Sequence, residues 1–186
     1  MDLILASNSP RRKDLLARLT SDFAVVPSRV DECETGPPEE RVIRTAWAKA
    51  RTVGRTARGV VIGADTMVVI DGETLGKPRT RAVAEAMLRR LSEREHSVLT
   101  GLCVLNTITG QERTHCEETR VTFRSIDEEE IAAYLEAGEY RDKAGAYAIQ
   151  GAAAKFVSGI VGDYTNVIGL PLCRLTLLLR DVGVRL

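Results

Sequence analysis

The chain contains the apolar run VVIGADTMVVI at residues Val60–Ile70. Apolar and polar residues do not alternate in it, so its length and β-branched side chains predict a strand buried on both faces. Asp65 lies in the middle of this run, where burying an unpaired carboxylate is costly. The small pair Gly63–Ala64 before it predicts room for a bulky group to approach the backbone. Asp65 is therefore either a structural carboxylate that accepts hydrogen bonds from a neighbouring loop, or a catalytic or metal-binding residue.

Composition and charge are those of an ordinary globular protein. The 186 residues fit a single domain over residues 1–186, with a lobed insertion as the alternative. Hydrophobic residues make up 44% of the chain and charged residues 28%, which provides enough apolar surface for a core. The 26 basic and 26 acidic residues give no net charge, which argues against a protein that binds nucleic acid through general phosphate attraction.

The sequence shows no targeting segment and no zinc-binding spacing. Residues Met1–Leu5 lack the basic and long apolar regions of a signal peptide. No apolar stretch reaches the roughly 18 residues that a membrane span requires. The 4 cysteines and 2 histidines are not spaced as zinc ligands. We therefore expect a cytoplasmic protein that does not bind a membrane.

The N-terminal region predicts a strand followed by a helix with a basic start. Leu3–Ala6 is a short apolar run, and Ser9–Pro10 is typical of an N-cap and a first helical position, which predicts a helix over about 10–19. Arg11–Lys13 places cations in the first turn, where the helix dipole disfavours them. An oligophosphate bound there would compensate this charge, and a solvated basic turn is the alternative.

The next segment predicts an acidic loop and a helix. The loop Asp31–Glu34 is either solvated or supplies metal ligands. The helix Pro38–Gly54 carries apolar residues, Trp47 among them, on its inner side. Lys49 lies beside that face, so its ammonium either reaches solvent or points into a cleft.

The remaining segments complete an α/β pattern. We expect strands at Phe23–Pro27, His96–Thr107, Glu112–Phe123 and near Phe156–Val157, a hairpin turn at Asp71–Gly72, and helices at Thr80–Leu91, Asp127–Gly138 and Pro171–Val182. The first of these helices, Thr80–Leu91, carries Val83 on its expected core face. Gly76 and Pro78 on either side of Lys77 predict a tight, rigid loop that holds the lysine. The glycines and small residues of Asp142–Gly151 suit a loop that approaches a ligand closely, with an ordinary loop as the alternative. Together the elements predict an α/β domain with a mixed, elongated central sheet flanked by helices.

Six short motifs in order resemble the Maf family of nucleoside triphosphate pyrophosphatases. They are Leu5–Arg12, Ala48–Ala50, Gly63–Thr66, Gly76–Pro78, Asp142–Gly145 and Gly169–Pro171. The resemblance spans nearly the whole chain. It implies an α/β fold with a nucleotide cleft, like that of the inosine triphosphatase group. It also implies hydrolysis of a nucleoside triphosphate to the monophosphate and pyrophosphate with a divalent metal cation such as Mg²⁺ or Mn²⁺.

The resemblance also implies roles for particular residues. Asp65 would be the general base or a ligand of the metal that activates the attacking water, and Glu32 would share that metal. The cations that would neutralise the triphosphate are Arg11, Arg12, Lys49 and Lys77, with hydrogen bonds from Ser7 and Ser9. A homodimer is consistent with the resemblance.

Three residues resemble the Maf group that acts on dTTP and UTP rather than the group that acts on 7-methyl-GTP. They are Arg11, Thr66 and Gln150. The carboxamide of Gln150 donates and accepts at once, which matches the edge of uracil or thymine, whereas a cationic methylguanine would favour a carboxylate. We therefore expect a dTTP/UTP pyrophosphatase. The alternatives are a 7-methyl-GTP pyrophosphatase and a nucleotide-binding regulator of cell division without significant turnover.

Overall fold

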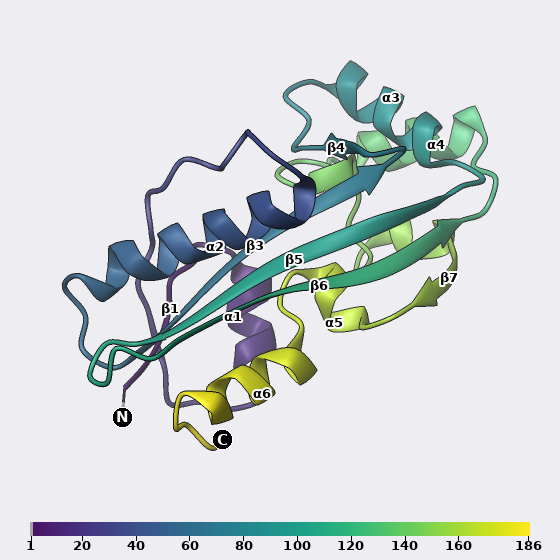
Figure 1. The fold of residues 1–186 in the computed structure, drawn as a ribbon. Coiled ribbons are helices and arrows are strands. Elements are labelled where there is room, and N and C mark those ends of the chain that lie inside the picture. Colours follow the sequence, from purple (N-terminus) through teal and green to yellow (C-terminus); the bar gives the residue numbers. More distant parts are fainter. Residues whose placement is uncertain (1) are drawn as a thin grey trace. The chain divides into compact units, whose positions relative to one another are not determined.

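The computed structural model describes residues 2–186 and contains a mixed sheet with helices (Figure 1). The strands are β1 (Leu3–Leu5), β2 (Ala24–Val25), β3 (Val60–Ile70), β4 (Glu73–Leu75), β5 (Glu95–Asn106), β6 (Glu112–Phe123) and β7 (Val157–Val161). The α-helices are α1 (Pro10–Leu16), α2 (Pro38–Gly54), α3 (Arg81–Leu91), α4 (Glu128–Glu136), α5 (Tyr164–Ile168) and α6 (Leu172–Asp181). Two 3₁₀ helices, η1 (Ala144–Ala146) and η2 (Ala152–Phe156), lie in the region after α4.

The strands form one sheet in the order β2–β1–β3–β5–β6–β7, with β4 paired to β3. Strand β1 pairs in parallel with both β2 and β3. Strand β4 is antiparallel to β3, and β7 is antiparallel to β6. The predicted mixed α/β sheet is therefore confirmed, as is the hairpin turn between Ile70 and Glu73.

The residues group into two compact units. The first unit contains the residues up to Thr66, Leu99–Glu117 and Thr165–Leu186, and the second contains Met67–Val98 and Glu118–Tyr164. Strands β3, β5 and β6 contribute residues to both. The single domain over residues 1–186 stays a prediction, as does its alternative with a lobed insertion.

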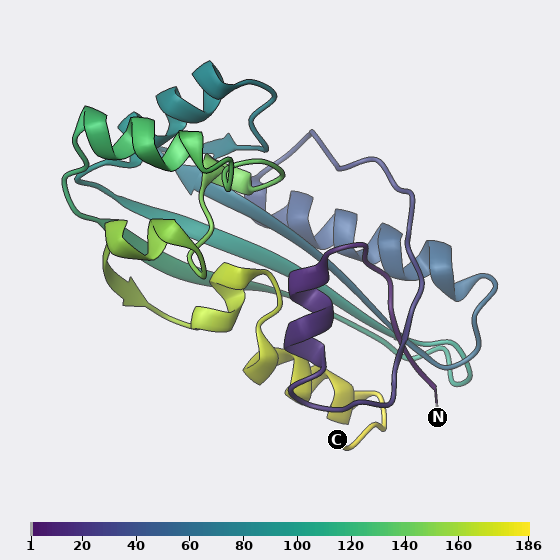
Figure 2. The ribbon, with the colours of Figure 1, turned by 180° about the vertical axis from the view of Figure 1, so that it is seen from behind.

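The first unit has helices on both faces of its strands. Figures 1 and 2 show α2 on one face and α1 and α6 on the other. Beneath α2, a cluster of buried apolar residues forms the core: Ile4, Val61, Cys103 and Leu105 from the strands, Ala6 just after β1, and Ala46, Ala50 and Val53 from the helix. Because side chains alternate along a strand, Leu5 points to the other face, where α1 buries Leu15 and Leu16.

The second unit packs helices and aromatic rings around its part of the strands. Helix α3 contacts α4 and η1. The rings of His96, Phe123 and Tyr147 lie edge to face, with centroids 4.9–5.4 Å apart. Such edge-to-face contacts are the favoured geometry of aromatic pairs, and they fill the core of this unit.

Two apolar residues that were expected on core faces are exposed instead. Trp47 is 42% exposed, because its indole N–H donates to Glu112 Oε1 (2.9 Å) and Arg51 lies over its ring. Val83 is also 42% exposed, whereas its neighbour Ala84 is fully buried. Leu88 and Leu91 are buried as predicted, so only the start of the inner stripe of α3 differs, with Ala84 in place of Val83.

Smaller differences concern the ends of helices. Helix α1 ends at Leu16 rather than near Leu19, because Arg18 and Leu19 donate to carbonyls three residues back and tighten the last turn. Ser9 occupies the N-cap position, but its side chain makes no capping hydrogen bond. Helix α5 was not predicted, since five residues are too few for a periodic pattern.

Candidate active site

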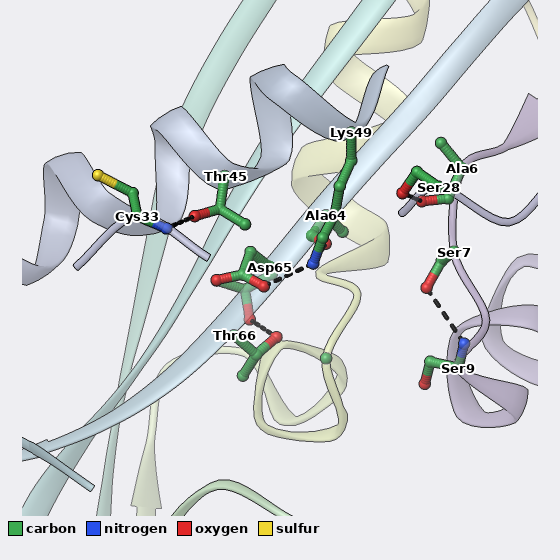
Figure 3. Close-up of polar contacts among 12 residues, drawn as sticks. Ala6, Ser7, Ser9, Ser28, Cys33, Thr45, Lys49, Ala64, Asp65 and Thr66 are labelled. Carbon is green, nitrogen blue, oxygen red and sulfur yellow. Dashed lines mark hydrogen bonds and ion pairs between the residues drawn. The ribbon is translucent and has the colours of Figure 1, made fainter. Parts of the chain in front are cut away.

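Asp65 and Lys49 form a buried ion pair in the first unit. Lys49 Nζ lies 2.7 Å from Asp65 Oδ1, and the two side chains are 14% and 5% exposed. The same ammonium donates to the carbonyl of Ala64 (3.4 Å), so two of its three N–H groups contact the strand (Figure 3). Among residues 2–186, the other carboxylate oxygen of Asp65, Oδ2, has no hydrogen-bond partner although it is buried. This oxygen is the one that the protein leaves for another group.

Gly63 explains how Lys49 reaches the strand. A Cβ at this position would lie 2.1 Å from the carbonyl oxygen of Ala46 and 2.9 Å from the backbone nitrogen of Ala50. Helix α2 therefore packs directly on the backbone of β3, which brings Lys49 over the strand. The expected room beside Gly63 exists, and it is filled by the protein's own helix.

Arg12 is held on three sides by the protein. Its Nε donates to the carbonyl of Gly169 (2.7 Å), its Nη2 to Thr66 Oγ1 (3.0 Å) and its Nη1 to Ser7 Oγ (3.3 Å). Ser7 is 5% exposed, and its hydroxyl also accepts a hydrogen bond from the backbone N–H of Ser9 (3.2 Å), as Figure 3 shows. A guanidinium has five N–H groups, so this arrangement orients Arg12 and leaves two for a ligand.

Charged residues surround the Arg12 guanidinium. Burial is the largest effect on Arg12, and it lowers the pKa of this guanidinium. The negative charges of Asp65 and Glu32 raise the pKa of Arg12 by attraction, and the positive charge of Arg11 lowers it by repulsion. Glu32 and Arg11 are thus near enough to Arg12 to act on its charge, and Glu32 itself is exposed. In the first unit, hydrogen bonds thus join Ser7, Ser9, Arg12 and Thr66, and an ion pair joins Lys49 to Asp65. The charge of Asp65 acts on Arg12, and Arg11 and Glu32 lie close by.

Lys77 and Gln150 belong to the second unit, and both are exposed. Their loops are tied to each other, because the N–H of Gly145 donates to the carbonyl of Gly76 (3.2 Å). The loop of Gln150 is also anchored where the backbone N–H of Ala148 donates to the hydroxyl of Tyr134 (3.2 Å). The rigid loop of Lys77 and the loop that was expected to approach a ligand thus meet within one unit.

Two members of the polar cluster in the first unit were missed by sequence reasoning. Thr100 on β5 hydrogen-bonds to Thr66 through their hydroxyls (2.9 Å), and its hydroxyl also donates to the carbonyl of Asn166 (3.2 Å). Thr100 is a polar residue inside the buried run 98–106, which is the same signal that singled out Asp65. Asn166 lies in the short helix α5 and carried no signal.

Residues 2–186 contain no group of three or more histidine, cysteine, aspartate or glutamate side chains that could hold a metal ion. An oxygen-donor site built from two carboxylates and the substrate is not of that kind. Within the same residues, no helix has the length and apolar character needed to cross a membrane.

Comparison with known proteins identifies the family. Residues 2–182 match the family described as Maf-like protein. This chain belongs to the Maf family. Relatives named dTTP/UTP pyrophosphatase include those of Thermococcus gammatolerans, 49% identical over 97% of this chain and 96% of its own, and Symbiobacterium thermophilum, 50% identical over 97% and 94%. The relative of Moorella thermoacetica, which has the same name, is 49% identical over 98% of this chain and 95% of its own.

Solved structures show more distant likenesses to this Maf protein. One is a nucleoside-triphosphatase / dITP/XTP pyrophosphatase from Mycobacterium abscessus, with a TM-score of 0.43 and 17% identity over 68% of this chain and 76% of that one. The other is the Staphylococcus aureus Ham1 protein, with a TM-score of 0.49 and 14% identity over 66% of this chain and 72% of that one.

Proposed function

We propose that this Maf protein hydrolyses dTTP and UTP to the monophosphate and pyrophosphate. The observation that carries the proposal is the identity of 43–50% over nearly the full chain with relatives named for that activity. The buried Asp65 with one oxygen held by Lys49, beside the basic start of α1, supports it independently.

Asp65 is the proposed catalytic residue. In hydrolysis of the α–β phosphoanhydride, water attacks phosphorus in line while negative charge builds on the departing pyrophosphate. Lys49 fixes Oδ1, so Oδ2 is directed to the remaining task of accepting a proton from the water or binding a cation. This division between the two oxygens is a reason for placing a carboxylate inside an apolar strand.

A divalent cation fits the donor chemistry of this region. The unpartnered Oδ2 of Asp65 is a hard oxygen donor of the kind that Mg²⁺ and Mn²⁺ prefer, and Glu32 is the proposed second protein ligand. When bound, such a cation supplies charge neutralisation at the phosphates and a more acidic water.

The remaining residues are proposed to bind the substrate. Arg12 has two N–H groups to offer a phosphate, and its three protein contacts hold it in one orientation. Lys49 keeps one N–H group for the same purpose. The proposed further contacts are Arg11, Ser7, Ser9 and Thr66 in the first unit and Lys77 and Gln150 in the second.

Gln150 is the proposed reader of the base. Its exposed carboxamide has both a donor and an acceptor for the adjacent N–H and carbonyl groups of uracil or thymine. Discrimination built on such hydrogen bonds is strong, because the wrong base leaves polar groups unpaired.

A substrate panel with product identification tests the proposal. The protein is incubated with dTTP, UTP, dCTP, dGTP and 7-methyl-GTP in Mg²⁺ or Mn²⁺, and the products are separated. We expect monophosphate and pyrophosphate from dTTP and UTP at the highest kcat/KM, and a weaker preference in Gln150→Glu. A best rate with 7-methyl-GTP would overturn the base preference alone, whereas nucleotide binding without turnover would favour the cell-division regulator.

Two proposals about context accompany the function. We place the enzyme in the cytoplasm, where the nucleoside triphosphates that would be its substrates are made. We also retain the homodimer that the family implies, and sedimentation equilibrium over a range of concentrations measures it directly.

A further inference from the structure

A chain of hydrogen bonds lies under Arg12 in the first unit. Arg12 Nη2 contacts Thr66 Oγ1 at 3.0 Å, Thr66 Oγ1 contacts Thr100 Oγ1 at 2.9 Å, and Thr100 Oγ1 contacts the carbonyl of Asn166 at 3.2 Å. Thr100 is 0% exposed. Thr100 is not part of any of the six sequence motifs, and it is not among the residues proposed to contact the base or the phosphates of the substrate.

The chemistry of a hydroxyl gives this chain one direction. A hydroxyl has a single hydrogen, and a carbonyl oxygen only accepts. Thr100 must donate its hydrogen to Asn166, so between the two threonines Thr66 is the donor. Arg12 only donates, so Thr66 accepts from it. Every hydrogen bond therefore runs away from Arg12, and bonds aligned in this way polarise and strengthen one another.

The far end of the chain returns to Arg12 through a short turn. The carbonyl of Asn166 also accepts from the backbone N–H of Gly169 (2.9 Å), and the carbonyl of Gly169 accepts from Arg12 Nε (2.7 Å). Gly169 has φ +122°, and a Cβ there would lie 3.4 Å from Thr66 Oγ1. The turn thus closes a ring of contacts, and it needs glycine because few other residues adopt this backbone conformation.

We propose that Thr100 is a positioning residue that sets the orientation of Arg12 through Thr66. By accepting the only hydroxyl hydrogen of Thr66, Thr100 turns the lone pairs of Thr66 toward the guanidinium. Thr66 then cannot donate to a nucleotide oxygen, so it serves the substrate by aiming Arg12 rather than by donating to the ligand. The inference rests on the proposed pyrophosphatase function, and it narrows the role of Thr66 within it.

A double-mutant cycle on dTTP hydrolysis tests this inference. Thr100→Val keeps the approximate shape and removes the hydroxyl, and we expect kcat/KM to fall about tenfold, the worth of one hydrogen bond of roughly 1.4 kcal/mol. Thr100→Ser keeps the hydroxyl and should restore most of the activity. If Thr100 acts through Thr66, Thr66→Val and the double variant Thr66→Val/Thr100→Val should have the same kcat/KM.

Thr107→Val is the matched control. The hydroxyl of Thr107, also in the first unit, accepts from the N–H of Gly59 (2.9 Å) and donates to its carbonyl (3.0 Å), and within residues 2–186 it makes no hydrogen bond to the polar cluster. We expect this variant to lower Tm about as much as Thr100→Val while leaving kcat/KM unchanged.

Two outcomes would overturn the inference: multiplicative losses in the double variant, or a Thr100→Val enzyme with lower Tm and normal kcat/KM. Wild-type turnover of dTTP tests the proposed function separately. If wild type binds dTTP without hydrolysing it, the same cycle is read in the Kd for dTTP, where the same non-additivity is expected and multiplicative losses count against the inference.

Discussion

Among residues 2–186, each unit contains one buried titratable side chain with an oxygen or nitrogen atom that has no hydrogen-bond partner. In the first unit Asp65 is 4% exposed, and its Oδ2 has no hydrogen-bond partner among residues 2–186. In the second unit His96 is 3% exposed, and over the same residues its Nδ1 has none. The two side chains are alike in that both are buried and each has one polar atom without a hydrogen-bond partner. Their surroundings are not.

Asp65 is surrounded by charge and His96 by aromatic rings. Lys49 contacts the carboxylate, and Arg12 lies within range of its charge. His96 Nε2 hydrogen-bonds to the hydroxyl of Tyr147 (2.8 Å), and the rings of Phe123 and Tyr147 pack edge-on against it. With no opposite charge to offset burial, the pKa of His96 falls to about 4. An unpaired atom thus indicates a reactive site where counter-charges surround it, and a neutral core residue where apolar rings do.

The largest expected effect is on catalysis at Asp65. Asp65→Asn keeps an oxygen that accepts from Lys49 but removes the charge and the basicity of the second oxygen. We expect kcat for dTTP to fall by about 10²–10⁴-fold, the usual contribution of a general base, in a variant that still folds. Pyrophosphate release and thermal unfolding are measured on the same preparation. Near-normal turnover in the folded variant would show that Asp65 is a structural residue, as His96 is, rather than a catalytic one.

A second expected effect is on stability at Lys49. Lys49→Met leaves the carboxylate of Asp65 buried without its counter-charge, which should lower the free energy of unfolding by about 3–5 kcal/mol. The double variant Lys49→Met/Asp65→Asn has no buried charge at this place and should recover most of that loss. Urea unfolding of the wild type, both single variants and the double variant measures the coupling. Additive losses would show that the ion pair is not what stabilises this region.

The smallest expected effect is a pH dependence of stability from His96. The unfolded histidine binds a proton near pH 6.5, while the folded one does so only near 4, so acidification across this range favours the unfolded chain. The contribution of His96 to the free energy of unfolding is fully present above pH 6.5. It decreases by up to about 3 kcal/mol as the pH falls toward 4.

His96→Gln provides the control for that prediction, because a carboxamide can hydrogen-bond to Tyr147 but does not titrate in this range. Denaturant midpoints at several pH values should show a shallower acid decline in this variant than in the wild type. If the denaturant midpoint falls equally with acid in both proteins, His96 is not buried as a neutral ring. The two buried side chains would then no longer differ in the way described above.

Several parts of the fold could be predicted because their signals are local. The strand Val60–Ile70 was predicted with both ends correct, since β-branched residues run up to a turn at Asp71. The helix Pro38–Gly54 was also predicted with both ends correct, from a proline at its start and a stripe of apolar residues. Asp65 was identified because a charged residue interrupts an apolar run, whereas the uncharged Thr100 in a similar run passed unnoticed.

The sequence by itself determined most of the helices and strands, the buried acid and the family resemblance, because periodicity, capping and short motifs are read over a few neighbouring residues. Only the tertiary structure decided that Lys49 is the partner of Asp65, through the close packing of α2 over Gly63. It alone also brought Gly169 to Arg12, 157 positions away in the chain. Such contacts depend on how separate elements pack, and local patterns carry no information about which residue will face which across that distance.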